Sequence, residues 1–301
     1  MSNFSGLFAT PVTAYDESGN IDPKGIRTLV EFVSENGVQN LFCLGSWGGF
    51  ALMTNDERKK AAEAYLKASE DCGMPCIINV ASTTQRDAIN LAKHAEDFGA
   101  SAVASLVPYY YSSSSYNEKN ILNYFDELVS STNVPVHLYN NPRTTGFNLN
   151  MQMFKSLLNV GISGMKDGGG NISMLTSMID FINNEKIDFD LIPGTVSIMP
   201  ITLLYGLKAN MVGSSVVFPE LAVSAWNAWH EGDITKFVQK HSILMKLRKV
   251  QETFGMGSAS CYKLLSMRGV DIGVPRKPWI GLSDAQAKEI SDTLKNMGLY
   301  L

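Results

Sequence analysis

The sequence predicts an α/β protein built as a (β/α)₈ barrel, a closed sheet of eight parallel strands surrounded by helices, with a helical region appended after it. Short continuous apolar runs alternate with amphipathic segments eight times, which is typical of parallel strands that are buried on both faces. The eight units fit within the first 231 of 301 residues, a length that suits a closed barrel. Beyond them, helical patterns continue without strand signals.

The first four units carry clear helix signals. Thr54 and Glu57 form a capping box ahead of an alanine-rich stretch, and apolar residues recur close to every 3.6 positions between Ala88 and Phe98. The predicted strand and helix pairs are 6–12 with 23–36, 41–44 with 54–68, 76–80 with 88–98, and 102–107 with 121–129.

The last four units follow the same alternation. Met174, Met178 and Ile182 share one face of a predicted helix. The predicted pairs are 134–138 with 151–158, 162–165 with 174–182, 189–192 with 198–207, and 211–212 with 221–229. A doubly wound open sheet is the alternative, but it usually has a glycine-rich turn after its first strand, and segment 9–15 contains no glycine.

Two domains are expected, a barrel at 1–231 and a three-helix region at 232–301. The predicted helices of the second domain are 234–253, 259–268 and 283–297, and Ser283 with Gln286 forms a capping box for the last. No linker rich in Pro, Ser or Gly precedes this region, so we expect it to pack on the barrel.

Composition excludes several classes of function. The 25 Lys and Arg against 29 Asp and Glu give a net charge of −4, so we expect no nucleic-acid partner, which needs a basic patch. No apolar run approaches the roughly 20 residues of a membrane span, and the N-terminus lacks a basic and then apolar leader. A cytoplasmic protein is therefore expected. The cysteines have no zinc-site spacing, so no metal is predicted; they are Cys43, Cys72, Cys76 and Cys261.

Lys166 is the most informative candidate for catalysis. Functional residues of this fold lie at the carboxyl ends of the strands, and Lys166 ends the apolar stretch that starts at Ile162. Partial burial in the barrel mouth favours the neutral amine, which is a nucleophile. The alternative is a structural lysine paired with Asp167.

Other strand ends supply further polar groups. Tyr139 and Tyr110 are able to carry protons if hydrogen bonds align them, although tyrosines at such positions also serve as rim packing. Ser46 precedes a glycine-rich turn whose backbone N–H groups suit a carboxylate or a phosphate; the alternative is a plain turn. Thr144, from the end of the fifth strand, belongs to the same set of strand-end residues.

The chain resembles the dihydrodipicolinate synthase and N-acetylneuraminate lyase superfamily of pyruvate-dependent class I aldolases over nearly its whole length. The tyrosine–asparagine motif at 139–140 and the lysine–aspartate motif at 166–167 carry the resemblance most specifically. Further matching residues are 9–12, 44–46 and 48, 56–58, 92–96, 108–110, 138, 142, 145–146, 164–165, 268–273 and 275–276.

This resemblance implies a (β/α)₈ barrel with helices at its end and a Schiff base between Lys166 and pyruvate or another 2-keto acid. It implies that Tyr139 transfers protons, that Ser46 links Tyr139 to the outside, and that Tyr110 completes the relay from a neighbouring subunit of a homotetramer. It also implies that the backbone N–H groups of Ser46 and Trp47 bind the keto-acid carboxylate. No cofactor is implied.

Departures from the family pattern bear on the substrate. Trp47 stands where Thr is common, and the arginine that binds a distal carboxylate in the synthase branch has Thr144 in its place, with Arg143 one position earlier. Residues 195–197 lack the acidic side chains of the sialic-acid branch. The predicted substrate-binding residues are Ser46, Trp47, Arg143, Thr144, Gly194, Met211 and Gly213.

Segment 213–220 resembles the branches that act on 2-keto-3-deoxy sugar acids. We therefore expect an aldolase for such an acid and an aldehyde. A dehydratase using the same imine, a 4-hydroxy-tetrahydrodipicolinate synthase and a barrel that only binds are the alternatives. The products distinguish the first two, because an aldolase releases pyruvate and an aldehyde.

Overall fold

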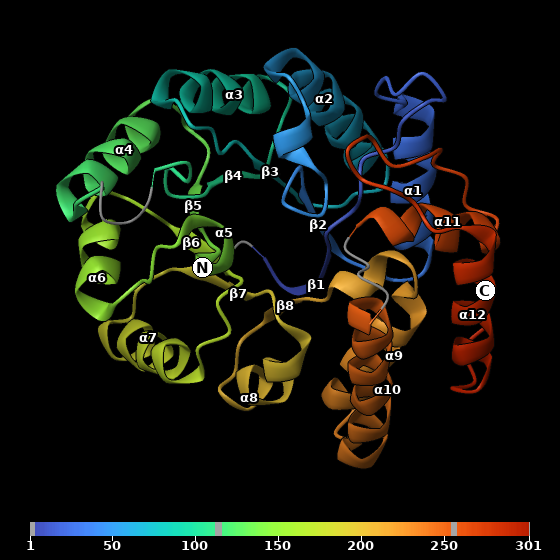
Figure 1. The fold of residues 1–301 in the computed structure, drawn as a ribbon. Coiled ribbons are helices and arrows are strands. Elements are labelled where there is room, and N and C mark those ends of the chain that lie inside the picture. The colour runs from blue at the N-terminus through green and yellow to red at the C-terminus, as the bar shows by residue number, and fades with distance from the viewer. Residues whose placement is uncertain (1–3, 112–115, 254–257, 301) are drawn as a thin grey trace. The chain divides into compact units, whose positions relative to one another are not determined.

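The computed structural model describes residues 4–111, 116–253 and 258–300. Within these ranges eight strands form one parallel sheet in the order β7-β6-β5-β4-β3-β2-β1-β8, and helices alternate with them along the chain (Figure 1). Three helices follow the last unit. The predicted (β/α)₈ barrel with C-terminal helices is confirmed.

The strands are short, and every strand residue except Asn140 is buried, as parallel strands covered on both faces should be. They are β1 (Gly6–Ala9), β2 (Asn40–Cys43), β3 (Cys76–Asn79), β4 (Ala102–Ser105), β5 (Val136–Asn140), β6 (Gly164–Asp167), β7 (Asp190–Pro193) and β8 (Ala209–Met211).

Most helices begin and end within a few residues of their predicted limits. They are α1 (Pro23–Glu35), α2 (Asn55–Asp71), α3 (Gln85–Asp97), α4 (Glu118–Ser130), α5 (Pro142–Thr145), α6 (Met151–Asn159), α7 (Ile172–Glu185), α8 (Met199–Leu204), α9 (Pro219–His230), α10 (Ile234–Thr253), α11 (Ala259–Met267) and α12 (Asp284–Lys295). Both predicted capping boxes form, at Thr54 with Glu57 and at Ser283 with Gln286.

One helix was not predicted, and several strands have limits that differ from the prediction; β1, for example, ends at Ala9 rather than at residue 12. The four residues of α5 were not predicted, because one turn is too short to show a helical period. Strand β6 begins at Gly164 rather than at residue 162 and extends to Asp167, so Lys166 lies inside the strand and not at its last position. Polar residues at the end of a strand thus pair in the sheet although they interrupt the apolar pattern.

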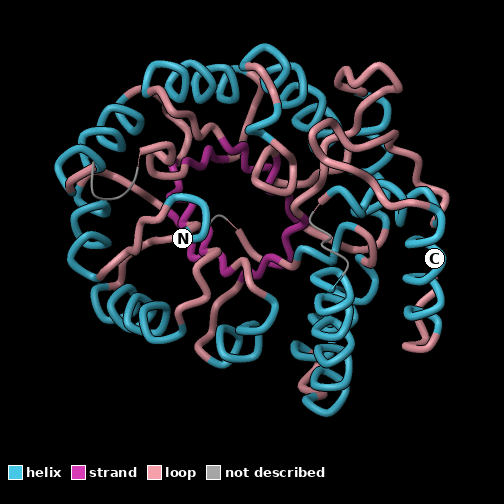
Figure 2. The backbone as a smooth tube through the Cα atoms, in the orientation of Figure 1, coloured by secondary structure: helices cyan, strands magenta, loops and turns pink. Residues whose placement is uncertain are grey.

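The chain divides into two compact units: unit 1 is Met1–Gly6 with Pro75–Met211, and unit 2 is Leu7–Met74 with Val212–Leu301. In unit 1, β3 to β8 form the inner layer and α3, α4, α6, α7 and α8 form the outer layer, whereas the single turn of α5 lies inside the ring of helices (Figure 1 and Figure 2). Unit 2 holds β1, β2, α1, α2 and α9 to α12. The domain boundary at 231 stays a prediction. No helix within the described ranges combines the length and apolar character that a membrane crossing needs.

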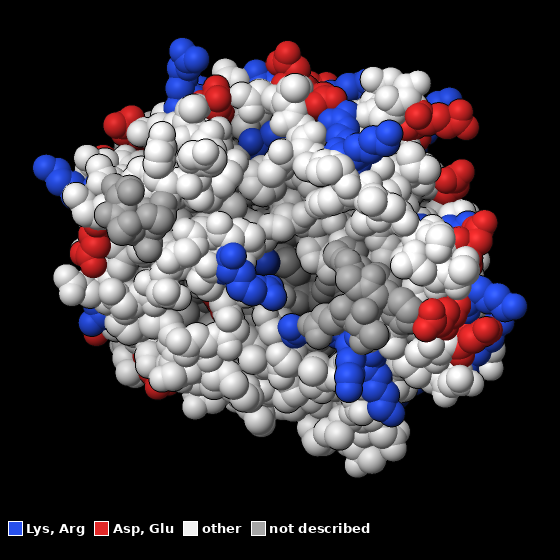
Figure 3. All heavy atoms as spheres, in the orientation of Figure 1, with Lys and Arg blue, Asp and Glu red and all other residues white. Residues whose placement is uncertain are grey.

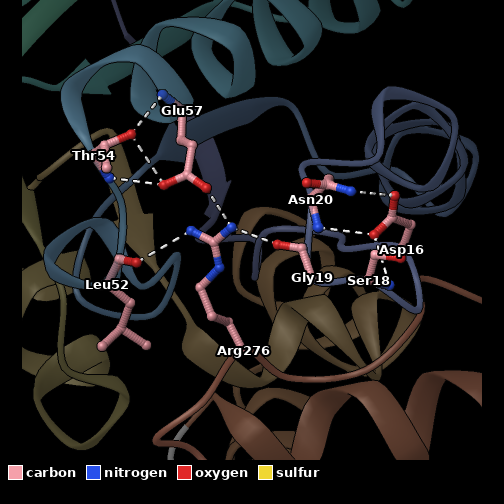
Figure 4. A network of polar contacts seen from close by, with 8 residues as sticks. All are labelled: Asp16, Ser18, Gly19, Asn20, Leu52, Thr54, Glu57 and Arg276. Carbon is pink, nitrogen blue, oxygen red and sulfur yellow. Dashed lines mark hydrogen bonds and ion pairs between the residues drawn. The ribbon is translucent and has the colours of Figure 1, made fainter.

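A polar network in unit 2 joins segments that are far apart in the sequence. The guanidinium of Arg276 donates to the backbone oxygens of Leu52 and Gly19 and pairs with the Glu57 carboxylate, as Figure 4 shows. It also lies over the ring of Tyr15, 4.6 Å from its centre, and burial raises the pKa of that tyrosine to about 12. One arginine thus ties the start of α2 to the loop before α1.

Glu57→Gln is expected to lower the free energy of unfolding at neutral pH by about 1–2 kcal/mol, a value reduced by solvent screening of this partly exposed pair. The hydrogen bond from Arg276 holds the pKa of Glu57 at about 2, below its ordinary 4.5. A carboxylate with a depressed pKa stabilises the fold fully above its unfolded-state pKa, and this contribution is lost as the pH falls towards the folded value.

Urea titrations give the free energy of unfolding of both proteins at each pH. The difference between wild type and Glu57→Gln should therefore shrink as the pH falls from neutral to about 3. Asp56→Asn, at the neighbouring exposed position of the same helix, is the control and should give no such narrowing. A difference in unfolding free energy that stays constant with pH would contradict the depressed pKa of Glu57.

Candidate active site

The sheet register of unit 1 places the two principal candidates beside each other. Tyr139 on β5 pairs with Lys166 on β6. Both side chains are buried, with 4% of Tyr139 and 9% of Lys166 exposed, and the Lys166 Nζ atom lies 4.2 Å from the centre of the Tyr139 ring. A primary amine therefore lies over the face of a tyrosine ring in a place largely shielded from bulk water, which suits a nucleophilic amine.

Two glycines lie close to the amine of Lys166. A Cβ atom at Gly194 would lie 2.7 Å from Lys166 Cε and 3.1 Å from Nζ, and one at Gly168 would lie 3.3 Å from Nζ. A side chain at Gly194 would therefore displace the lysine. Gly194 was predicted to line the substrate site, and the structure brings it against Lys166.

Asn141 is a candidate that the sequence analysis missed. Its side-chain N–H donates to the Tyr139 hydroxyl at 3.4 Å, and Asn141 is itself buried. Its backbone oxygen accepts hydrogen bonds from Thr144 and Thr145, so the first turn of α5 fixes its position. The available signal was the spacing of two residues from Tyr139, which puts both side chains on one side of an extended chain. An N–H donor leaves the hydroxyl hydrogen of Tyr139 available to another acceptor.

The remaining unit 1 candidates have different environments. Tyr110 follows β4 and is 78% exposed, with its ring in edge contact with Tyr111 at 5.4 Å between centres. Arg143 and Thr144 lie on α5 and are exposed, whereas Met211 is buried at the end of β8. Tyr110 is thus open to contact by another molecule.

In unit 2, the loop after β2 is fixed by buried hydrogen bonds. The hydroxyl of Thr13 donates to the Gly48 oxygen at 2.7 Å, and the hydroxyl of Tyr262 donates to the Thr13 oxygen at 2.6 Å. Ser46 and Trp47 on this loop are half-buried. The bond to Gly48 anchors the loop that carries both residues to the segment at Thr13.

Trp47 lies against Gly213, the residue that begins the turn after β8. A Cβ atom at Gly213 would be 3.2 Å from Trp47 Cζ2. The structure thus brings together two of the predicted substrate-binding residues of unit 2, and the close approach of the indole depends on the absence of a side chain at Gly213.

Charged side chains are unevenly distributed on the surface. Acidic and basic side chains are interspersed along the edge of the face seen in Figure 3, whereas Lys and Arg side chains gather near its centre. No group of three or more His, Cys, Asp or Glu side chains within the described residues is placed to hold a metal ion.

Comparison with known proteins identifies the family. Residues 3–297 match the dihydrodipicolinate synthetase family. A probable 2-dehydro-3-deoxy-D-pentonate aldolase of Escherichia coli K12 is 30% identical over 249 residues, which are 82% of this chain and 81% of the relative. A 4-hydroxy-tetrahydrodipicolinate synthase of Methanothrix thermoacetophila is 26% identical over 297 residues, which are 98% and 97% of the two chains.

Solved structures agree with the sequence match. The prophage protein YagE of E. coli K12, crystallised in complex with pyruvate, aligns over 99% of this chain and 100% of its own, with a TM-score of 0.90 and 26% identity. The N-acetylneuraminate lyase of Proteus mirabilis, at 21% identity and a TM-score of 0.88, shares the fold. Since the family match spans nearly the whole chain, this protein belongs to the dihydrodipicolinate synthetase family of aldolases and lyases.

Proposed function

We propose that the protein is a Schiff-base aldolase that makes or cleaves a 2-keto-3-deoxy sugar acid, with pyruvate bound as an imine at Lys166. The observation that carries this proposal is the buried Lys166 amine, which lies 4.2 Å from the Tyr139 ring centre and close to Gly168 and Gly194. The pentonate aldolase name of one relative and the pyruvate complex of another support the choice of substrate.

The proposed reaction centres on the Lys166 amine and the Tyr139 side chain. The Lys166 nitrogen bonds to the keto carbon of pyruvate and water leaves, which gives a protonated imine. The imine withdraws electrons from the methyl carbon, and Tyr139 takes part in moving the proton that this carbon loses. The resulting enamine bonds to the carbonyl carbon of an aldehyde, whose oxygen gains a proton. Water then hydrolyses the imine, releases the keto acid and restores Lys166; cleavage follows the reverse path.

The loop residues of unit 2 are assigned by family resemblance. We infer that the backbone N–H groups of Ser46 and Trp47 bind the keto-acid carboxylate, and that the Ser46 hydroxyl extends the proton path of Tyr139. The hydrogen bond from Thr13 to Gly48 supports this role, because a fixed backbone can present its N–H groups without reorganisation. Gly213 leaves room for the indole of Trp47 to border the substrate.

Borohydride trapping tests the proposal. Incubation with pyruvate and borohydride should add the mass of a reduced pyruvate imine, and peptide mapping should place it on Lys166. Trapping with longer 2-keto acids then defines the chain length that the site accepts. An adduct spread over surface lysines, or none on folded protein, would contradict the proposal. Product analysis separates the aldolase from a dehydratase, because only the aldolase releases pyruvate and an aldehyde.

Arg143→Ala is expected to raise KM for 2-keto acids with a second carboxylate by about tenfold and to leave monocarboxylate substrates unchanged, because a hydrogen-bonded charge pair is lost only with the former. Arg86→Ala, also an exposed arginine of unit 1, is the control. Equal losses for both substrate classes would mean that Arg143 does not bind the distal carboxylate.

We also propose a homotetramer in which Tyr110 reaches the site of a neighbouring subunit. The exposure of Tyr110 in the single chain supports this role, because its side chain is accessible to a second subunit. In the active assembly that subunit would cover it. Light scattering should give four times the mass of the chain, and Tyr110→Phe should lower kcat without changing that mass.

A further inference from the structure

The Asp167 carboxylate, next to Lys166 in sequence, has both oxygens committed to backbone and amide donors. Oδ1 accepts from the Asn140 side chain at 2.7 Å and from Gly169 N–H at 3.1 Å, and Oδ2 accepts from Gly170 N–H at 3.2 Å. The residue is only 3% exposed. A carboxylate in such a place requires these donors, since an uncompensated buried charge is costly.

These bonds hold the ends of three neighbouring strands together. Asn140 and Asp167 pair in the register of β5 and β6, directly beyond Tyr139 and Lys166. The Asn140 oxygen accepts from Gly168 N–H at 2.7 Å, and the Asp167 backbone oxygen accepts from Gly194 N–H at 2.7 Å, which reaches the end of β7. The same two residues therefore fix Gly168 and Gly194, the two glycines that lie close to the Lys166 amine.

We propose that Asn140 and Asp167 form a positioning pair that sets the geometry between the Lys166 amine and the Tyr139 ring. The pair acts through the backbone of the strand ends and through the loop at 168–170. The arrangement of Asp167 disfavours a direct role as an acid or base, because its oxygens face Asn140 and the glycine loop. This inference rests on the proposed imine chemistry at Lys166.

The test compares the rate of imine formation in wild type with the rate in variants of the pair. Wild type, Asp167→Asn and Asn140→Asp are mixed with pyruvate, trapped with borohydride at short times and quantified by intact mass. Asp167→Asn keeps the shape of the side chain but replaces one acceptor with a donor. We expect imine formation about ten- to a hundredfold slower, as small displacements of reacting groups produce, with an apparent Kd for pyruvate that changes less than about threefold.

The exchanged pair, Asn140→Asp combined with Asp167→Asn, restores one carboxylate and one amide with the charge on the opposite strand. We expect this double variant to recover most of the wild-type rate of imine formation. If the single variants were slow only because their packing is disturbed, combining them would not restore the rate. Asp180→Asn, an exposed acid on α7 of the same unit, should keep the wild-type rate.

Each outcome bears on a different proposal. If wild type forms the adduct on Lys166 and Asp167→Asn forms it equally fast, the positioning role is overturned while the proposed function stands. If wild type gives no adduct, the proposed function fails. Should Asp167→Asn not fold, Asn140→Ala removes the same link from the less buried side, and a wild-type rate in that variant overturns the inference as well.

Discussion

Replacing Lys166 with alanine is expected to lower kcat for cleavage of a 2-keto-3-deoxy sugar acid by about 10⁴-fold or more, because the variant lacks the nitrogen that forms the imine. Binding of the substrate carboxylate should persist, so KM should change far less than kcat. The measurement is pyruvate release, coupled to reduction by lactate dehydrogenase, over a range of substrate concentrations. The melting temperature should stay close to wild type, which separates lost chemistry from lost structure.

Lys155→Ala is the matched control for this prediction. Lys155 also lies in unit 1 and also contacts an aromatic ring, with Nζ 4.4 Å from the centre of Phe181. It lies on α6 and is exposed, so its removal should leave kcat unchanged. Measurable turnover in Lys166→Ala at more than a few per cent of wild type would exclude the imine mechanism at this residue.

The sequence predicted the architecture because each element carries a local signal. Apolar runs of strand length, helical periods and two capping boxes are properties of neighbouring residues, and a parallel sheet follows from their alternation. Lys166 was found for a related reason, since a charged residue that closes an apolar run at a strand end points to function in this fold.

What the sequence did not show depends on register and on distant contacts. The bond from Asn140 to Asp167 and the bond from Asn141 to Tyr139 require knowing which residues of β5 face those of β6 and how α5 begins. Arg276 meets Glu57 across 219 positions of sequence, and no local pattern predicts that pair. The family resemblance covered Asn140, Asp167, Glu57 and Arg276 but not Asn141, and it assigned none of them a role in positioning other residues.

A second large effect is expected where two backbone segments touch in unit 2. Gly273 pairs with Tyr15 in an isolated parallel bridge and has φ of +77°. A Cβ atom there would lie 1.8 Å from the Tyr15 backbone oxygen, well inside van der Waals contact. The obstacle is main chain and cannot rotate away, so Gly273→Ala must separate the two segments. We expect the free energy of unfolding to fall by about 3–5 kcal/mol.

Gly269→Ala isolates the steric part of that loss. Gly269 has nearly the same φ, +79°, but an added Cβ would meet nothing within 4 Å. Its cost should be only the conformational preference of glycine, about 1 kcal/mol. Urea unfolding of both variants gives the difference directly, and an excess of at least about 2 kcal/mol for Gly273→Ala is expected. Equal losses of unfolding free energy in the two variants would mean that the segment at Gly273 can move away from Tyr15 at little cost. The contact with Tyr15 would then not support the loop that places Arg276 beside Glu57.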